Sequence, residues 1–356
     1  MTDPLAPRDV PLLTPDLPGT CGTVRLAEED FRVEELPLYE PSGQGGHLYL
    51  LVEKVGRTTQ EVARELAAAL GARERDVGYA GLKDKRAVAV QSLSVPVPPR
   101  AGGFVERGAA AAGAGWRVLH AALHGNKLRP GHLRGNRFRI VVRGTVPDAL
   151  ARAERICAEL RSHGAPNLFG AQRFGQRGDN AALGAAILRR DAAPRDRFLR
   201  RLALSALQAE LFNRCLAARL RDGLFEVAID GDVLRKRETG GLFVSEDPAA
   251  DTARVRAGEI DPAGPLPGHS LFAARGAALE RESAVVTEAG IDPRSFVVGG
   301  GEMEGARRAY RVRVEGLGVG GAGRDALVLE FSLPRGSYAA CVLREVMKEA
   351  TPAEEE

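Results

Sequence analysis

The amino-acid sequence predicts an α+β protein in which a strand-rich domain is interrupted by a mainly helical segment. Strand-like alternation of charged and apolar residues begins at Val24, a long helical pattern covers Phe198 to Leu220, and strand patterns return at Leu327 to Leu333. The chain has 356 residues, which suits two domains because single cores stop growing near ~250 to 300 residues. The strand-rich domain is therefore expected to be discontinuous in sequence.

The first strands are indicated by alternation and by a turn. Val24 to Glu35 alternates β-branched or aromatic residues with charged ones, as in a half-buried strand followed by a turn. Pro41 to Gly46 is rich in turn-forming residues, and His47 to Lys54 is again strand-like. We expect residues 41–46 to form a hairpin loop, with 47–54 as the returning strand.

The clearest helix of the N-terminal half has signals at both ends. Thr58 can cap it, and Val62, Leu66 and Leu70 recur on one face. Gly71 is placed to end it.

A charged loop is expected between two strands. Val77 to Ala80 is short and apolar, Gly81 to Arg86 is charged, and Ala87 to Val95 is strand-like. Further strands are expected at Val118 to Leu123 and at Phe138 to Val142.

The rest of the chain contains three helical patterns and one predicted strand pair. We expect helices at Ala149 to His163, at Phe198 to Leu220 and from Ser337 to Lys348, and strands at Tyr310 to Val314 and Leu327 to Leu333 around a glycine-rich turn. Gly316-x-Gly-x-x-Gly321 matches a dinucleotide-binding pattern, but the strand that follows leaves no room for a βαβ unit, so we interpret it as the hairpin turn.

The distribution of charge is more informative than its total. Fifty basic residues balance 47 acidic ones. Between Glu106 and Asp148 there is no acidic residue, which predicts a strongly positive face suited to nucleic acid. The basic residues of this acid-free run are Arg107, Arg117, Lys127, Arg129, Arg134, Arg137, Arg139 and Arg143.

Several classes of protein are disfavoured. The four cysteines are far apart and form no Cys-x-x-Cys pair, which argues against zinc and against secretion and favours a reduced, cytoplasmic setting. His120 and His124 have the spacing of zinc ligands on a helix, but their segment is strand-like, so no metal is expected. No apolar run approaches the roughly 20 residues of a membrane span.

Gly81-Leu-Lys-Asp-Lys-Arg86 is the first candidate site. One carboxylate, Asp84, stands among three cations, which favour its ionised form. An ionised aspartate can act as a nucleophile toward an electron-poor carbon. The alternative is a solvated charged turn, but the flanking strands favour a rigidly held loop.

The second candidate is the basic segment Asn126 to Arg139. Its cations can neutralise phosphates, and its glycines permit close approach of a ligand to the backbone. Asn136 and Phe138 are two positions apart and point the same way from a strand, so one can read a base edge while the other stacks on the base. The alternative is an edge strand with Phe138 in the core.

Pro166 to Gly175 is the third candidate. Polar and aromatic residues gather there with two glycines at the expected domain junction, where ligands often bind. A structural hinge, with Asn167 and Gln172 satisfying buried backbone, explains the segment equally well.

Five segments, in this order, resemble the TruD family of tRNA pseudouridine synthases. They are Glu29-Asp-Phe31 with Val33 and Glu34, Val77 to Val88 with Gln91, Lys127-Leu-Arg129 with Gly135-Asn-x-Phe138, Pro166 to Gly175, and Pro334-x-Gly-Ser-Tyr-Ala339 with Leu343-Arg-Glu345. They run from near the N-terminus to the final helix.

The resemblance implies a pseudouridine-synthase catalytic domain with a mixed, mainly antiparallel sheet and flanking helices, interrupted by a TruD-type α/β insertion domain. The boundaries that we expect are a flexible arm at 1–20, the catalytic domain at 21–165 and 306–350, the insertion at 166–305 and an acidic tail at 351–356.

The resemblance also implies an isomerase that acts on tRNA, at the uridine at position 13 of the D arm. This reaction requires no redox cofactor or metal. Nothing in the sequence demands a membrane, a protein partner or more than a monomer, and the oligomeric state stays open. It assigns catalysis to Asp84, stacking on the uracil to Phe138 and support to Asn136. Arg25 stands where a lysine is familiar, and we expect it to pair with Asp84. Further substrate contacts are expected from Phe31, Lys83, Lys127, Arg129, Asn167, Gln172 and Arg173.

Two other functions remain open at this point. A non-catalytic RNA-binding or RNA-folding protein would keep the basic surface and would have no need of a lone carboxylate in a cationic loop. A generic basic α+β protein explains the charge but not the five ordered segments.

Overall fold

The computed structural model describes residues 10–99, 102–175, 177–298 and 303–348. The expected acidic tail, Gly299 to Gly301 and the first nine residues of the expected arm lie outside these ranges. The chain forms two compact units, each of which contains separate stretches of sequence. The sheet unit comprises Leu17–Arg161, Val314–Ala339 and Val346–Glu356, and the helical unit comprises Met1–Asp16, Ser162–Arg313 and Ala340–Glu345.

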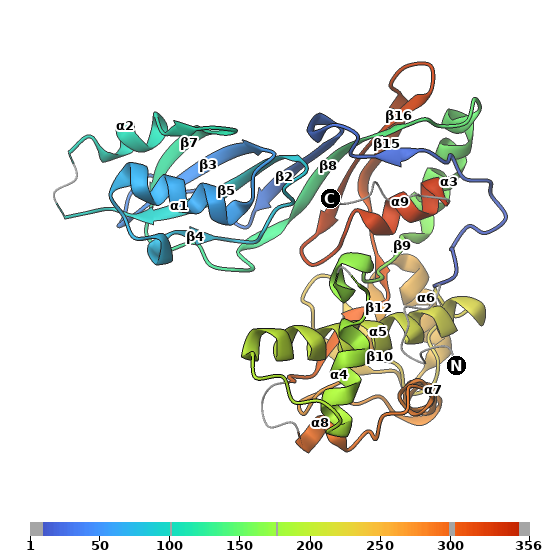
Figure 1. The fold of residues 1–356 in the computed structure, drawn as a ribbon. Helices are drawn as coiled ribbons and strands as arrows, with labels where there is room; N and C mark the ends of the chain where they lie inside the picture. Colours follow the sequence, from blue (N-terminus) through green and yellow to red (C-terminus); the bar gives the residue numbers. More distant parts are fainter. Residues whose placement is uncertain (1–9, 100–101, 176, 299–302, 349–356) are drawn as a thin grey trace. The chain divides into compact units, whose positions relative to one another are not determined.

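The sheet unit is built on a ten-stranded sheet (Figure 1). Its strands are β1 (Thr23–Val24), β2 (Phe31–Pro37), β3 (His47–Val55), β4 (Gly78–Tyr79), β5 (Val88–Pro96), β6 (Ala112–Gly113), β7 (Trp116–His124), β8 (Leu133–Arg143), β15 (Glu315–Gly321) and β16 (Ala326–Pro334). Their order is β15-β16-β8-β2-β5-β3-β7-β6, while β1 pairs with β8 and β4 with β5. Among the described residues, β2 and β5 form the parallel pair of this sheet and its other pairs are antiparallel.

The predicted hairpin between the first strands is wrong. Strand β5 lies between β2 and β3, so residues 41–46 connect strands that are not neighbours. The turn residues mark a change of chain direction, but the partner of a strand is decided by contacts distant in sequence, which local patterns do not encode.

The strand pair predicted near the C-terminus is also wrong in part. The glycine-rich segment is not a turn but strand β15, which pairs with β16. Within the predicted strand Tyr310 to Val314, Arg311–Val312 forms the short strand β14 of the helical unit. A bulge between Glu315 and Gly318 shows how the irregular pairing of an edge strand accommodates glycines.

Helix α1 (Thr59–Leu70) forms between the predicted cap and the predicted terminal glycine, and it covers one side of the sheet (Figure 1). The Thr58 side chain accepts a hydrogen bond from the Glu61 amide, and the Glu61 carboxylate accepts one from the Thr58 amide, which forms a capping box. Gly71 ends the helix with φ 66°, a left-handed conformation that favours glycine. The inner face of α1 packs on buried leucines and valines of β3 and β5. This packing gives a rigid frame to the loop between β4 and β5.

The other helices of the sheet unit are α2 (Phe104–Ala109) and most of α3 (Ala149–His163). Short 3-10 turns lie at Glu28–Asp30 and Glu74–Asp76. Helix α3 starts and ends where its period predicted. Its buried face consists of Ala149, Ala153, Ile156, Cys157 and Leu160.

The helical unit surrounds a small antiparallel sheet with helices. Its sheet has the order β11-β10-β12-β13, and β9 pairs with β14. The strands are β9 (Ala165–Pro166), β10 (Val233–Lys236), β11 (Leu242–Val244), β12 (Ile260–Leu266), β13 (Ala306–Ala309) and β14 (Arg311–Val312). The helices are α4 (Asn180–Arg189), α5 (Arg197–Arg221), α6 (Pro248–Ala257), α7 (Gly276–Glu288) and α8 (Ser295–Val298), with a 3-10 turn at Ala171–Phe174. The predicted stripe on α5, from Ala203 to Cys215, is buried.

The C-terminal helix α9 (Ala340–Met347) begins three residues after the predicted cap, Ser337. The fully buried carboxylate of Glu345 accepts hydrogen bonds from the amides of Leu13 and Thr14. The described part of the expected flexible arm is thus held by specific contacts. The prolines of the arm suggested a flexible segment, but the backbone amides of an extended segment can still donate hydrogen bonds to a buried carboxylate.

Among the described residues, no helix has the length and apolar character needed to cross a membrane.

Candidate active site

Asp84 lies in the loop that joins β4 to β5, and its backbone is fixed by a buried lysine. The Lys54 ammonium, on β3, donates hydrogen bonds to the carbonyl oxygens of Arg57, Lys83 and Asp84 at 2.6, 3.3 and 2.7 Å. Only 1% of Lys54 is exposed. Burial lowers the pKa of its ammonium to about 8; the Asp84 and Glu61 carboxylates oppose the shift, and the Lys83 ammonium adds to it. Lys54 thus ties the loop to strand β3.

The loop is also fixed by helix α1, through a backbone amide. Thr59, the first residue of the helix, accepts a hydrogen bond from the Lys83 amide at 3.0 Å and donates one to the Gln91 side chain at 2.9 Å. Gln91 is buried on β5, and its side-chain nitrogen has no partner among the described residues. Lys54 thus fixes the carbonyl oxygens of Lys83 and Asp84, and Thr59 fixes the Lys83 amide.

The Asp84 carboxylate binds Arg25, which begins a row of aromatic contacts. Arg25 Nη2 lies 2.6 Å from Asp84 Oδ2, and 41% of the aspartate side chain is exposed. The Arg25 guanidinium lies 4.1 Å from the centre of the Phe31 ring. Phe31 is 6.1 Å from Phe138, which is 5.3 Å from Phe331, between ring centres. A half-exposed carboxylate is thereby joined, through one cation, to a buried aromatic row.

The backbone of Arg25 adopts φ 64°, which non-glycine residues seldom do. Arg86 donates a hydrogen bond from its guanidinium to the Arg25 carbonyl oxygen at 3.2 Å. Such a conformation costs about 1 to 3 kcal/mol, and costs of this kind are concentrated at functional sites. The neighbouring Leu26 and Leu82 are 60% and 61% exposed, so apolar surface flanks the ion pair.

Lys83 and Asn136 are both neighbours of Glu35 on β2. The Lys83 ammonium is turned inward and binds Glu35 at 2.7 Å, with both side chains buried. Glu35 on β2 is the cross-strand partner of Asn136 on β8, whose buried Oδ1 has no hydrogen-bond partner among the described residues. Lys83 therefore anchors the loop here, while Asn136 keeps an unused acceptor.

Phe138 points to the same side of the sheet as Asn136, as its spacing predicted. Only 6% of it is exposed, because Phe31 and Phe331 pack on either side. Gly135 was expected to admit a phosphate, but a Cβ there would lie 2.1 Å from the Leu333 carbonyl oxygen. The space beside Gly135 is thus filled by the neighbouring strand.

The two cations expected from the loop before β8 differ in their surroundings. The Lys127 ammonium donates to the Arg75 carbonyl oxygen at 3.0 Å, whereas Arg129 is exposed to solvent. The Gly131 amide donates to the Ala80 carbonyl oxygen at 2.8 Å, which fastens this basic loop to the start of the Asp84 loop.

The positive charge predicted from the acid-free run is neutralised in part. Four of its eight cations form ion pairs with acids from other segments, three of them on neighbouring strands and one, Asp30, in the turn before β2. These pairs are Arg117–Glu53 at 2.8 Å, Arg137–Glu34 at 3.5 Å, Arg139–Glu330 at 3.3 Å and Arg143–Asp30 at 2.7 Å. A hollow of about 430 Å³ on this side of the sheet is lined by both signs of charge.

Asn167, Gln172 and Arg173 belong to the helical unit. Asn167 is 6% exposed, its side-chain Nδ2 donates to the Ala309 carbonyl oxygen at 2.9 Å, and its side-chain oxygen accepts from Arg308. Arg173 donates to the Ser205 hydroxyl, and Gln172 is exposed. The contacts of Asn167 match the structural interpretation of this segment.

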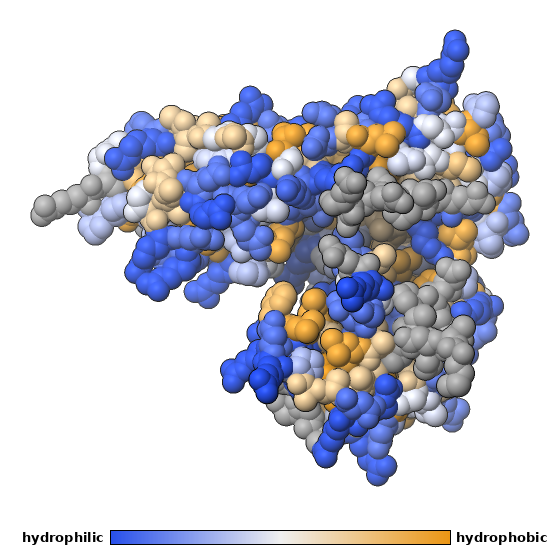
Figure 2. Space-filling view, in the orientation of Figure 1, coloured by the Kyte–Doolittle hydropathy of each residue, from blue (hydrophilic) through white to orange (hydrophobic). Residues whose placement is uncertain are grey.

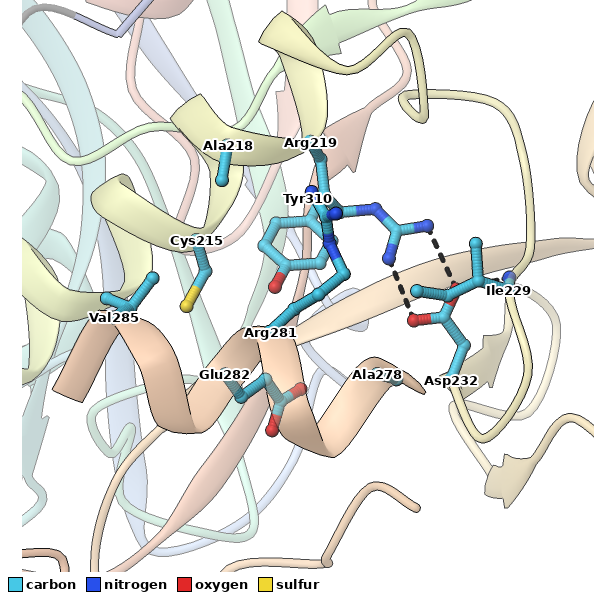
Figure 3. A pocket seen from close by; sticks show the side chains of 10 residues that line it. All are labelled: Cys215, Ala218, Arg219, Ile229, Asp232, Ala278, Arg281, Glu282, Val285 and Tyr310. Carbon is cyan, nitrogen blue, oxygen red and sulfur yellow. Dashed lines mark hydrogen bonds and ion pairs between the residues drawn. The ribbon is translucent and has the colours of Figure 1, made fainter. Parts of the chain in front are cut away.

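A second hollow lies inside the helical unit between α5 and α7 (Figure 3). Its volume is about 20 Å³, which suits one water molecule and excludes a nucleotide. Arg219 on its wall is paired with Asp232 at 2.8 Å. Burial raises the pKa of the Cys215 thiol to about 12, so this sulfur is no nucleophile near neutral pH. The cavity is therefore not a candidate active site.

Sequence reasoning missed Lys54 and Glu35, although a signal for each exists. Leu48, Leu50 and Val52 alternate toward the core along β3, and Lys54 occupies the next inward position. Glu35 likewise continues the inward positions of β2. A charged residue at a core position must have polar partners nearby, which is a recognisable signature of a built site.

Comparison with known proteins agrees with these motifs and this fold. The family model described as "tRNA pseudouridine synthase D (TruD)" matches residues 9–194 and 195–346. A protein named tRNA pseudouridine synthase D from Anaeromyxobacter sp. (strain Fw109-5) is 53% identical over 346 residues, 96% of each chain. A relative of the same name from Thermus thermophilus is 41% identical over 357 residues, covering 98% of this chain and 97% of its own.

The fold agrees with a crystal structure from Methanosarcina mazei that is assigned to TruD. The TM-score is 0.78 at 25% identity, with 97% of each chain covered. The fold and the matches define an RNA-modifying isomerase. The chain belongs to the TruD family of tRNA pseudouridine synthases. The predicted family, α+β fold class and enzyme class are confirmed.

Proposed function

We propose that this chain converts the uridine at position 13 of the tRNA D arm to pseudouridine, with Asp84 as the catalytic carboxylate. The observation that carries the proposal is the half-exposed carboxylate of Asp84, bound to Arg25 at the end of an aromatic row, in a loop fixed by Lys54 and Thr59. A binding protein would have no use for a carboxylate held so firmly among cations.

The reaction is an isomerisation that needs no net oxidation or reduction. The bond from N1 of uracil to C1′ of ribose breaks, the base turns, and C5 bonds to C1′. The hydrogen on C5 leaves as a proton, and N1 gains one. Asp84 can attack C6 or C1′, or remove a ribose proton to give a glycal, and all three routes begin from a carboxylate beside the flipped nucleotide.

Arg25 and Asn136 are proposed to support this step. The guanidinium orients the Asp84 carboxylate through the 2.6 Å ion pair, and the unused oxygen of Asn136 is available to accept a hydrogen bond from N3 of uracil. Flipping the target base costs about a few kcal/mol. Stacking on Phe138 would return about 1 to 3 kcal/mol, and because its ring is covered, we propose that base entry uncovers one face.

Tritium release from tRNA labelled at C5 of uridine tests the role of Asp84. We expect release with the native protein and none with Asp84→Asn. Asp76→Asn is the matched control, because Asp76 is an aspartate of the same unit that pairs with Arg73 at 2.7 Å, and it should release tritium normally. Normal release by Asp84→Asn would refute its role.

The position of the target uridine needs a separate experiment. A transcript with cytidine at position 13 should release no tritium from its remaining labelled uridines. Undiminished release from that transcript would exclude position 13 and leave the assignment of Asp84 untouched.

A further inference from the structure

The turn between α4 and α5 carries a dense group of arginines around an exposed aromatic ring. Residues 189–201 contain six arginines and two aspartates. The basic patch is defined here as Arg189, Arg190, Arg195, Arg197, Phe198 and Arg201, all of which are exposed. Helices α4 and α5 pack as neighbours, since a Cβ at Gly184 would lie 2.4 Å from the Ala203 carbonyl oxygen. The end of α4 and the start of α5 therefore form one surface.

The two acids within the patch are already engaged. Asp191 pairs with Arg189 at 3.0 Å, and the Asp196 carboxylate accepts a hydrogen bond from the Phe198 amide at 2.8 Å, which caps α5. Arg190, Arg195, Arg197 and Arg201 have no acidic partner within the described part of the chain. The basic patch thus differs from the ten-stranded sheet, where Arg117, Arg137 and Arg139 pair with glutamates on neighbouring strands.

The location of these cations opposes folding. The first turn of α5 contains no acidic residue, and Arg197 and Arg201 are four residues apart near the positive end of the helix dipole. Positive charge there is unfavourable, as is a like-charged pair at this spacing. Phe198 is 75% exposed, the most exposed large apolar side chain of the described residues, and adds little to the core. Folding therefore does not explain this composition.

A bound nucleic acid would make the arginines, the helix N-terminus and the exposed ring favourable. Phosphates would neutralise the arginines, the positive helix end would attract them, and an unstacked base could lie on the Phe198 ring. In Figure 2 the surface over α4 and the start of α5 carries both hydrophilic and apolar residues. The patch has the two features, cations and an exposed ring, that single-stranded or looped RNA requires.

We propose that the basic patch is a second RNA-binding site, on the helical unit, which holds phosphates and one unpaired base of the substrate tRNA. The proposal rests on the proposed function for the identity of the RNA. It assigns binding, not chemistry, to this surface, so tRNA affinity depends on it while turnover of bound tRNA does not.

The test compares two double variants of the full chain. Arg197→Ala/Arg201→Ala removes two unpaired cations of the patch. Arg256→Ala/Arg294→Ala removes two exposed arginines elsewhere in the same unit and serves as the matched control. Binding of labelled tRNA is measured by fluorescence anisotropy over a range of salt concentrations, and kcat and KM are measured by tritium release.

For the patch variant we expect roughly tenfold weaker binding, a salt dependence shallower by about one to two phosphates, a higher KM and an unchanged kcat. Phe198→Ala should weaken binding roughly fivefold or more with the salt dependence unchanged. Thermal stability should stay the same or rise in the patch variant, because alanine at these positions relieves the unfavourable charge; a structural role would lower it.

Equal affinity of the patch and control variants for tRNA would overturn the proposal, as would weaker binding only to vesicles of anionic lipid. In both cases tritium release by the native protein would leave the proposed function standing. A native protein that neither binds tRNA nor releases tritium would instead overturn the proposed function and this inference with it.

Discussion

Replacing Lys54 by methionine should separate the position of the Asp84 loop from the stability of the fold. The ammonium is 1% exposed and binds three backbone carbonyl oxygens, two of them in the loop that carries Asp84. Methionine has a similar length and no donor. The variant therefore keeps the volume of the side chain and removes the three hydrogen bonds.

Two opposing terms set the effect on stability. The decrease of the Lys54 pKa from 10.5 to about 8 means that burial disfavours the charged form by about 3 kcal/mol, a cost that methionine does not carry. Each carbonyl oxygen left without a donor costs about 1 to 3 kcal/mol. The net loss of unfolding free energy should be about 3 kcal/mol, which leaves a protein of ordinary stability folded.

The effect on turnover should be much larger. Displacing a catalytic group by about 1 Å can cost about a hundredfold in rate, and the loop backbone loses its attachment to β3. We expect kcat at saturating tRNA to fall about a hundredfold with KM little changed. Tritium release measures turnover, and urea denaturation measures stability. Lys85→Met removes an exposed lysine of the same loop and should keep kcat. A Lys54→Met protein that is folded and has kcat within about threefold of native would refute the reasoning.

Three further predictions concern the same site. The native kcat should fall as pH rises through about 8, because Lys54, which faces Asp84, Lys83 and Glu61, then becomes neutral and keeps two N–H donors for three carbonyl oxygens. The pKa of Lys54 is lower in the folded protein than in the unfolded chain, so its contribution to the free energy of unfolding increases from pH 8 to 10.5. Unfolding through this group therefore does not explain the fall in kcat. A kcat–pH profile identical in Lys54→Arg would contradict this. Arg25→Lys should retain activity within about tenfold and Arg25→Met should lose more, since the ion pair with Asp84 survives only in the first; equal rates in a tritium assay would count against the pair. Glu35→Ala should lower the unfolding free energy by about 3 kcal/mol in urea, because the Lys83 ammonium stays buried without its carboxylate, and a loss below about 1 kcal/mol would argue against that pairing.

Elements with local signals could be predicted from the sequence, and strand partners could not. Helix α1 has its cap, its apolar face and its terminal glycine within 14 residues, and it forms where those signals lie. The parallel pairing of β2 with β5 joins Arg32 to Val88, across a distance in sequence that no turn motif spans. The glycines of β15 favour a turn in isolation, whereas pairing with β16 keeps the segment extended.

The candidate site divides in the same way. Asp84, Arg25, Asn136 and Phe138 could be named from motifs, since those motifs are short and ordered along the chain. The partners that fix them, Lys54 and Glu35, are single charged residues on inward strand positions, and their meaning depends on what lies opposite. The acid-free run misled for a related reason, because Glu34 and Glu330 reach Arg137 and Arg139 from neighbouring strands.

A single-turnover experiment with Asp84→Asn in excess over labelled tRNA addresses the catalytic role most directly, because all of the tRNA is then bound and only chemistry is measured. Affinity for tRNA should equal that of the native protein, while tritium release should be absent over many native half-times. Release at a rate within about tenfold of native, from tRNA shown to be bound, would mean that another group performs the chemistry.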